Sequence, residues 1–576
     1  MYSTPRHQLH CPRYTTSRLP VVGFCPQIMI SVAPSRLSLA ALPYEIRLEV
    51  FRNLPGDIYQ QRPILANIAS TCRALSDPAL DLLWHTMIDI EHLLILIPRV
   101  QIDRRSYGPY TTYHINGPIQ PSAWRRFDSY AKRIRVLEYA RPSYVLFILF
   151  ADLGQYRPGP LLPNLRQLSW DDVTQSRHQI TELGHILLSF PTHSLREVTV
   201  AATYVEQDDT AHRGLLKMAD LAQRDFLPRL ASNAPMVRCL TLSGYMPNLL
   251  LETLPEFSSL TDLTMSDLDG VLIDGKTFRA LSCLAALSTL SVDLRGVAAE
   301  ALLGWTGFPS LQSFTLDGTS VDIAAAVIST ISSTLFNNVC IKGSPRATVE
   351  ESRHLFTRLR NFKHTLATVS LTFDELTSPS NRRYPLTDII ESLLDLHRML
   401  HLQIISHQPN AVLVTDDCMD KMAVAWPGIK TLDLLFGYSQ PGITVRGLTA
   451  FAQKCPSLCD LCLDAIDFLH RVDLGTVPLS KSCLRSISFR RWLDEAHIDE
   501  NENVLESFKI AQAIDRLYPD LSMSYFSGPA MIENFIRGLQ AARCDERRRL
   551  RADTVESDEM AEVAARVTSI RVVFGD

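Results

Sequence analysis

The chain has 576 residues, of which 46% are hydrophobic and 21% charged, proportions typical of a globular protein that folds around a core. Its formal net charge of −5 provides no global attraction to nucleic acid or to an anionic membrane surface. No run reaches the roughly 18 apolar residues that a membrane-spanning helix needs. We therefore expect neither a membrane nor a nucleic-acid partner. The length allows two to four domains, unless repeats build one long body.

Cysteine usage indicates a reducing compartment. The chain has twelve cysteines with no spacing typical of a disulfide framework, and it has no Asn-x-Ser/Thr acceptor for N-glycosylation. Disulfides and glycans are features of secreted proteins, whereas a free cysteine inside the cell acts mostly as a small buried apolar residue. We therefore expect a cytoplasmic or nuclear protein, or one found in both places.

The amino-terminal segment has an unusual composition. Residues 1–44 contain four arginines but no aspartate, glutamate or lysine, a bias shared with organelle-targeting peptides. Prolines would break the amphipathic helix that such a peptide needs; they are Pro5, Pro12, Pro20, Pro26 and Pro34. We expect residues 1–37 to form a disordered tail. Organelle import and a later start at Met29 are the alternatives.

Residues 38–90 predict a small module of three helices. Pro43 suits the first turn of a helix, where its missing N–H costs nothing, and Glu45 then complements the positive end of the helix. The apolar side chains of this helix recur one or two turns apart and are expected to form one stripe, made by Ile46, Val50, Phe51 and Leu54. The residues Leu54-Pro55-Gly56 end the helix.

Two further helices complete the expected module. The second carries an apolar stripe of Ile64, Ile68, Cys72 and Leu75. The third has a start signal, with Asp77 as the N-cap and Pro78 at the first helical position. Its apolar residues are Leu80, Leu83, Trp84 and Met87. Three short helices bury little surface, so we expect the module to need a partner or an adjoining domain.

The order of these residues resembles an F-box. The residues Leu42-Pro43-x-Glu45-Ile46 are followed by Leu54-Pro55, then by Cys72-Arg73, and finally by Pro78 and Leu83-Trp84. Two features depart from the family: the polar stretch Asp57–Pro63 is long, and the tryptophan often found after Cys-Arg is missing. The alternative is a generic helical cap on the domain that follows.

The resemblance implies a docking role. In the family, the Leu-Pro start and the apolar residues after it face a Skp-type adaptor, which connects them to the cullin of a ubiquitin ligase. Carried over to this chain, adaptor binding is expected of Leu42, Pro43, Ile46, Val50 and Leu54. Cys72, Leu75 and Trp84 would pack the module and complete the contact. An apolar docking surface also predicts poor solubility in the absence of the adaptor.

A repeated pattern fills most of the remaining chain. Each copy is an apolar residue, two spacers, an apolar residue, one spacer and a further apolar residue, and most copies begin 24–31 residues after the previous one. The thirteen copies are Ile134-Leu137-Tyr139, Leu165-Leu168-Trp170, Leu195-Val198-Val200, Val237-Leu240-Leu242, Leu260-Leu263-Met265, Leu287-Leu290-Val292, Leu311-Phe314-Leu316, Phe336-Val339-Ile341, Leu366-Val369-Leu371, Met399-Leu402-Ile404, Ile429-Leu432-Leu434, Leu458-Leu461-Leu463 and Leu484-Ile487-Phe489.

Each copy predicts a short strand, and helical patterns lie between the strands. Examples of these helices are expected at Ile180–Phe190, Gly214–Leu230, Val297–Leu303, Asp388–Leu400, Val445–Lys454 and Val504–Leu517. A period close to that of leucine-rich repeats predicts a curved α/β repeat solenoid, leucine-rich-repeat-like, in which stacked repeats share one core. The shortness and the number of the strands argue against an ordinary α/β domain.

The residue at the centre of each strand is expected to point away from the core. These residues are Glu138, Ser169, Thr199, Thr241, Thr264, Ser291, Thr315, Cys340, Ser370, Gln403, Asp433, Cys462 and Ser488. Eight of the thirteen are serine or threonine, and no row of arginine, tyrosine or tryptophan marks a binding hot spot. The substrate-binding residues therefore stay unknown, and flanking residues or loops are expected to bind a ligand.

No motif supports catalysis. The sequence has no phosphate-binding loop, no G-x-S-x-G and no H-E-x-x-H, and its sixteen histidines are dispersed. Cys455, Cys459, Cys462 and Cys483 have a spacing that invites a metal, but strand alternation would turn Cys462 away from Cys455. We therefore expect no catalytic residues, no metal and no cofactor.

The sequence thus predicts five segments: a disordered tail at 1–37, the F-box-like module at 38–90, a linker at 91–130, the solenoid at 131–530 and a charged carboxy-terminal segment at 531–576. The expected function is that of a non-catalytic substrate-recognition subunit of a cullin-RING (SCF-type) ubiquitin ligase. Its partners would be the Skp-type adaptor, the cullin bound through it and an unidentified protein substrate. The alternative is a non-catalytic interaction scaffold whose helical start merely caps the repeats.

Overall fold

The computed structural model describes residues 38–88, 90–107, 110–139, 153, 159–172, 193–202, 224–246, 249–269, 272–302, 304–344, 346–378, 382–407, 412–436, 443–467, 474–480, 482–493, 500–527 and 530–550. The expected amino-terminal tail lies outside these residues. The chain divides into two compact units between Leu83 and Trp84. Within the described part of the chain, no helix combines the length and apolarity required to cross a bilayer.

The first unit contains four short helical elements: η1 (Leu39–Ala41), α1 (Tyr44–Arg52), α2 (Ile58–Thr71) and α3 (Arg73–Leu83). The Asp57 carboxylate caps α2 by accepting a hydrogen bond from the Gln60 amide. The small core contains Phe51, Leu65 and Ala79, with partly buried side chains such as Leu54 and Leu75 packed around it. The unit is therefore a three-helix body with little buried surface.

The predicted start of the third helix was wrong. Helix α3 begins at Arg73, and Pro78 lies inside it and is buried. A proline inside a helix cannot donate to the carbonyl four residues before it, here that of Ala74. The Arg47 guanidinium of α1 donates a hydrogen bond to that same carbonyl. A contact from a neighbouring helix thus replaces the missing backbone hydrogen bond.

The second unit is built on one parallel sheet. In the part of the chain that the structure describes, fifteen strands pair in the order β1-β4-β5-β6-β7-β8-β9-β10-β11-β13-β16-β18-β19-β20-β21. Their bounds are Thr86–Met87, Val136–Tyr139, Gln167–Asp172, Glu197–Ala202, Cys239–Tyr245, Asp262–Asp269, Thr289–Asp293, Ser313–Asp317, Asn338–Ser344, Thr368–Phe373, His401–Ser406, Thr431–Leu435, Asp460–Asp467, Ser486–Leu493 and Phe526–Ser527. The strand order follows the chain order, as expected for an α/β repeat solenoid.

The repeat pattern sets the register of the sheet. The middle apolar residues of successive copies, such as Leu290, Phe314 and Val339, are paired across neighbouring strands. Burial follows this pairing; in β9 and β10 every second residue is buried. The apolar positions of the pattern whose burial the structure describes therefore lie on the core side, and a strand forms at each of the thirteen copies, which confirms the predicted strands.

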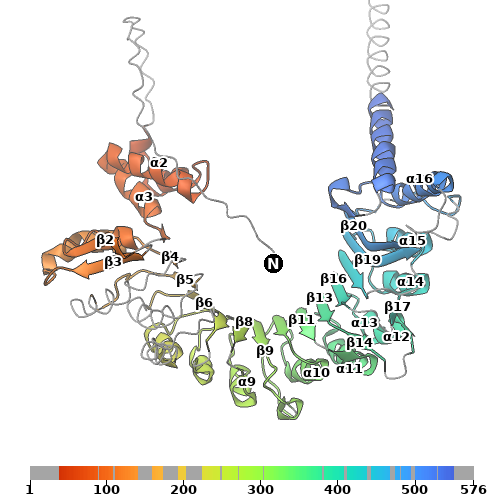
Figure 1. Cartoon of the computed structure of the whole chain (residues 1–576), viewed down its shortest axis with the longest axis horizontal. Helices are drawn as coiled ribbons and strands as arrows, with labels where there is room; N and C mark the ends of the chain where they lie inside the picture. Colours follow the sequence, from red (N-terminus) through yellow and green to blue (C-terminus); the bar gives the residue numbers. More distant parts are fainter. Residues whose placement is uncertain are drawn as a thin grey trace, which may run out of the picture. The chain divides into compact units, whose positions relative to one another are not determined.

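The connecting helices lie on one side of this sheet (Figure 1). They include α9 (Gly275–Leu281), α10 (Val321–Thr330), α11 (Val349–Leu359), α12 (Leu386–Ile389), α13 (Glu391–Leu394), α14 (Asp416–Ala425), α15 (Val445–Lys454) and α16 (Glu500–Leu517). Shorter turns of 3-10 helix are η4 (Leu251–Glu256), η5 (Ala299–Leu302), η6 (Arg360–Phe362) and η7 (Met523–Tyr525). The side that carries the strand-centre residues is called the open face below.

Side-chain caps define where several of these helices begin. Thr348 and Glu351 form a reciprocal capping box at the start of α11. The Asp416 carboxylate accepts hydrogen bonds from the Thr444 amide at 2.9 Å and the Gly447 amide at 3.1 Å, and so connects the starts of α14 and α15. A Cβ atom on Gly447 would lie 2.6 Å from the Asp416 Oδ1 atom, so this close approach requires glycine.

The region expected to be a linker has structure of its own. It contains α4 (Glu91–Leu94), the antiparallel hairpin β2 (Val100–Tyr107) and β3 (Tyr110–Ile115), η2 (Pro121–Ala123) and α5 (Trp124–Ala131). Leu93, Leu94, Trp124 and Phe127 are buried in the core of the second unit. The repeat core therefore begins well before the first copy of the pattern.

The core also extends past the predicted end of the solenoid. Residues 530–550 are helical, and Ile532 and Ile536 are buried in the same core as the repeats. The Arg543 guanidinium forms an ion pair of 2.6 Å with the Asp515 carboxylate of α16. The start of the charged carboxy-terminal segment thus packs as a continuation of the array. Its end, residues 551–576, lies outside the described residues.

Candidate functional site

Two sets of residues at α1, one position apart in sequence, lie in different surroundings. Tyr44, Arg47 and Phe51 face α3: the Tyr44 hydroxyl donates to the Asp81 carboxylate, the Arg47 guanidinium donates to the Ala74 carbonyl, and Phe51 is buried. Pro43, Ile46 and Val50 lie one residue before them, with the same spacing, on the outer side of the helix. They are exposed, and Ile46 retains 50% and Val50 43% of its accessible surface.

This arrangement divides the predicted apolar stripe. Phe51 belongs to the core, whereas Ile46 and Val50 form an outward surface with Pro43; these three residues are called the α1 face below. The contacts of Tyr44 and Arg47 hold α1 on α3, so the α1 face is presented by a fixed helix. Because an exposed apolar surface on a small helical unit costs free energy in water, it is a candidate docking surface.

The other residues nominated from the sequence lie in different surroundings. Leu42 and Leu54 are half-buried at the two ends of α1, and Leu75 is half-buried against the core of the first unit. Cys72 is exposed between α2 and α3. Trp84 lies beyond the first unit, where its ring packs against Tyr130 with ring centroids 4.6 Å apart. The structure therefore groups Leu42, Pro43, Ile46, Val50 and Leu54 on or beside one helix.

The thirteen strand-centre residues of the second unit form one continuous row. Each is the register partner of the next, from Glu138 paired with Ser169 to Cys462 paired with Ser488. None of them is buried. The row of strand-centre residues is therefore largely polar, and it contains no arginine, tyrosine or tryptophan.

Part of this row is connected by side-chain hydrogen bonds. The Ser370 hydroxyl donates to the Gln403 Oε1 atom at 2.6 Å, and the Gln403 Nε2 atom donates to an Asp433 carboxylate oxygen at 3.0 Å. Partial burial raises the pKa of Asp433, with a further contribution from the Asp460 carboxylate. Burial also raises the pKa of the neighbouring Cys462 thiol. The two hydrogen bonds connect the neighbouring strands β13, β16 and β18.

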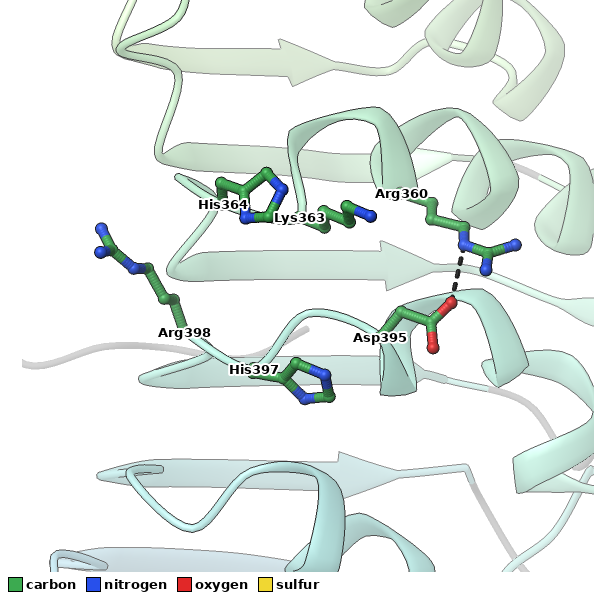
Figure 2. A pocket seen from close by; sticks show the side chains of 6 residues that line it. All are labelled: Arg360, Lys363, His364, Asp395, His397 and Arg398. Carbon is green, nitrogen blue, oxygen red and sulfur yellow. Dashed lines mark ion pairs between the residues drawn. The ribbon is translucent and has the colours of Figure 1, made fainter.

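An open hollow of about 350 Å³ lies near the ends of η6 and α13. Figure 2 shows the side chains that line it. Basic side chains and histidines dominate it: Arg360, Lys363, His364, His397 and Arg398. The carboxylate of its remaining residue, Asp395, forms an ion pair of 2.6 Å with the Arg360 guanidinium. The hollow offers contacts for an anion, and the residues that line it include no serine, threonine or cysteine nucleophile.

The four cysteines with metal-like spacing do not converge. Cys455 is buried, and its thiol donates to the carbonyls of Ala423 and Trp426 at 3.6 and 3.5 Å. Burial raises the pKa of the Cys455 thiol to about 12. Cys462 lies on the open face and Cys483 is exposed. Among the described residues, no group of three or more His, Cys, Asp or Glu side chains is placed to hold a metal ion.

Comparisons with known proteins add little to this picture. No family model matches the sequence, and no curated protein is detectably similar to it. Among solved structures, one chain in the crystal structure of the Rad7 and Elc1 complex in yeast matches 62% of this chain and 86% of its own length, with 15% identity and a TM-score of 0.30. A likeness at this TM-score carries no argument, so the proposals below depend on the residues alone.

Proposed function

We propose that this chain is a substrate-recognition subunit of an SCF-type cullin-RING ubiquitin ligase. The first unit docks on a Skp-type adaptor and, through it, on the cullin. The second unit holds a protein substrate. The chain itself performs no bond chemistry, and its contribution to ubiquitination is to bring the substrate close to the ubiquitin-carrying enzyme at high effective concentration.

The observation that carries this proposal is the α1 face. Pro43, Ile46 and Val50 are exposed on a helix that Tyr44 and Arg47 hold against α3. Covering such side chains completely stabilises a complex by about 1 kcal/mol each, since they are already half covered and full burial of an aliphatic side chain is worth about 1.5–3 kcal/mol. These positions are also those that the F-box resemblance assigns to the adaptor contact.

The small core of the first unit agrees with a docking role. Among the described residues, its core is a small cluster around the buried side chains of Phe51, Leu65 and Ala79, and a core of this size gives a unit of marginal stability. Binding to a partner stabilises the folded form because the partner binds that form alone. An adaptor would therefore both cover the α1 face and stabilise the unit, which fits the expected poor solubility of the chain alone.

Co-purification of the adaptor tests the proposal. The full chain would be co-expressed with a Skp-type adaptor as wild type, as Ile46→Asp/Val50→Asp and as Val424→Asp. Val424 is a matched control, because it is a comparably apolar side chain that is 61% exposed on α14. We expect wild type and the control to retain the adaptor and the double variant to lose it.

The same experiment distinguishes the proposed ligase subunit from the alternative, a non-catalytic interaction scaffold. Equal recovery of the adaptor with wild type and the double variant would show that the α1 face is not the docking surface. If the adaptor is absent from every preparation, the helical unit is only a cap on the repeats. In either case the ligase role proposed here would be rejected.

A further inference from the structure

Four arginines occupy the same position in four successive repeats. Arg135, Arg166, Arg196 and Arg238 each come immediately before a strand, at the starts of β4, β5, β6 and β7. These four residues are called the arginine row below. The copies of the repeat pattern align them, because each is the residue that follows the first apolar position of its copy.

Backbone hydrogen bonds stack the arginine row along one edge of the sheet. The Arg166 amide donates to the Arg135 carbonyl at 2.7 Å, the Arg196 amide to the Arg166 carbonyl at 2.8 Å and the Arg238 amide to the Arg196 carbonyl at 2.7 Å. Neighbouring strands are about 4.8 Å apart. The four positively charged side chains are therefore attached to backbone positions about 4.8 Å apart from one strand to the next.

No carboxylate neutralises the row within the described part of the chain. The Arg135 guanidinium donates to the Asn164 carbonyl, and the Arg196 guanidinium donates to the carbonyls of His193 and Leu195. Arg166 and Arg238 are exposed, and among the described residues their guanidinium groups have no hydrogen-bond or ion-pair partner. Like charges close together repel one another unless an anion lies between them. The row is therefore a surface suited to a negatively charged ligand.

Beyond the four arginines, the same edge is mostly uncharged. The residues at the same position before the later strands are Thr261, Ser288, Gln312, Asn337, Ala367, Leu400, Lys430, Cys459 and Arg485. None of the thirteen is acidic, although the whole chain has a net charge of −5. Glutamates do occur on the neighbouring open face, at Glu138 and Glu197 of β4 and β6. The positive charge is thus a narrow row along the edge of the sheet.

We propose that the arginine row binds an acidic segment of a protein partner. On an acidic helix, carboxylates three or four residues apart have Cβ atoms about 5–6 Å apart, close to the spacing of the row. Arginine binds carboxylates through paired hydrogen bonds. A single-stranded nucleic acid would need aromatic side chains for base stacking. The sequence neighbours of the four arginines are Ile134, Val136, Leu165, Gln167, Leu195, Glu197, Val237 and Cys239, none of them aromatic.

This inference rests on the proposed function in one respect: in a ligase subunit, the acidic segment belongs to the substrate. Its binding can be measured without the adaptor. The probe is a fluorescein-labelled peptide of alternating glutamate and alanine blocks, titrated with the full chain and followed by fluorescence anisotropy at low and high salt. A glutamine version of the peptide and a labelled single-stranded oligonucleotide are the comparison ligands.

The test variant is Arg166→Glu/Arg238→Glu, because these two side chains are exposed and have no hydrogen-bond or ion-pair partner among the described residues. The matched control is Arg224→Glu/Arg279→Glu, which makes the same charge change at exposed helical positions, Arg224 in the helical residues 224–233 and Arg279 in α9. We expect wild type and the control to bind the glutamate peptide, and the test variant to bind it about tenfold more weakly or not at all. Binding should also weaken as salt rises.

Three results would overturn the inference: no binding of the glutamate peptide by wild type, equal binding by the test variant, or tighter binding of the oligonucleotide than of the peptide. The adaptor co-purification distinguishes this failure from failure of the proposed function. If the chain retains the adaptor but does not bind the glutamate peptide, only the proposal that the arginine row binds an acidic segment is refuted. If the chain binds the peptide through the arginine row but does not retain the adaptor, only the proposed ligase role is refuted.

Discussion

The Arg47 guanidinium of α1 donates a hydrogen bond to the Ala74 carbonyl of α3, the acceptor that Pro78 leaves without a helical donor. This contact explains both why a proline is tolerated inside α3 and why α1 has a fixed rotation on it. With Arg47 and Phe51 turned inward, Ile46 and Val50 must face outward. The α1 face is therefore a consequence of how the first unit is held together.

Replacing Arg47 should destabilise the first unit, and replacing Pro78 should compensate. Arg47→Ala leaves the Ala74 carbonyl without its donor, at a cost of about 1–3 kcal/mol. In Pro78→Ala the residue 78 amide can donate to that carbonyl, so the loss caused by Arg47→Ala should be much smaller in this background. Hydrogen exchange of peptides covering residues 44–83 measures the effect, and the four chains form a double-mutant cycle. Equal losses in the two backgrounds would contradict this account.

The end of the repeat array depends on a buried hydroxyl. The Tyr518 hydroxyl, fully buried, donates to the Leu448 carbonyl of α15 at 2.9 Å. Tyr518→Phe removes this hydrogen bond from the core and should cost about 0.5–1.5 kcal/mol. Tyr525→Phe, at a side chain that is 68% exposed, makes the same chemical change and should leave stability unchanged. Thermal unfolding followed by calorimetry would compare the two; equal midpoints for both variants would refute the role given to Tyr518.

Cysteine reactivity should follow burial. Cys72, Cys283, Cys483 and Cys544 are exposed, whereas Cys418 and Cys455 are buried. Burial raises the pKa of Cys455 to about 12, and burial with the nearby Asp262 carboxylate raises that of Cys239 to about 11. Because the thiolate is the reactive form, iodoacetamide at pH 8 should label the four exposed thiols first and Cys455 only after unfolding. Peptide mapping gives the order, and rapid labelling of Cys455 in the native protein would be inconsistent with it.

Asp433 should make stability depend on pH in a definite direction. Its pKa is raised by burial above the ordinary value of about 3.8, so the folded chain binds more protons than the unfolded chain just above that pH. Stability from this residue is therefore full below about pH 3.8 and falls as the pH rises through the raised pKa. Asp433→Asn should be more stable than wild type at pH 7.

The stabilisation by Asp433→Asn should disappear at a pH below 3.8, where the wild-type carboxyl is neutral as well. An asparagine oxygen can still accept the hydrogen bond from Gln403, so the row of hydrogen bonds is kept. Asp520→Asn, at an exposed aspartate, serves as the control and should change stability little at either pH. Urea titrations at the two pH values measure the difference; a less stable Asp433→Asn at pH 7 would refute the assigned cause.

The repeat architecture could be predicted because its signal is local and recurs. Three apolar residues per copy fix which side of a strand is buried, and thirteen copies remove the ambiguity of any single one. Helix Val445–Lys454 was predicted with the bounds that α15 has. The prediction for Asp388–Leu400 was less accurate, because this segment forms the short helices α12 and α13 and then leads into β16. The helix expected at Ile180–Phe190 lies outside the described residues.

What could not be predicted depends on contacts between distant residues. The hairpin of β2 and β3 lies in a polar stretch whose pairing partners do not show in a local pattern. The start of α3 was misjudged because Asp77-Pro78 is a genuine start signal, and only the contact from Arg47, 27 residues before Ala74, overrides it. The single apolar stripe predicted for the first helix is divided for a related reason: Phe51 packs against the core, whereas Ile46 and Val50 are exposed, and packing on α3 decides between the two.

Calorimetric titration of the full chain with a purified Skp-type adaptor measures whether the α1 face is a docking surface. We expect saturable one-to-one binding with a negative heat-capacity change, since apolar surface is covered. Ile46→Asp/Val50→Asp should abolish this binding, and Val424→Asp should preserve it. No heat of binding with the wild-type chain, or the same affinity for the double variant, would contradict the docking role of the α1 face.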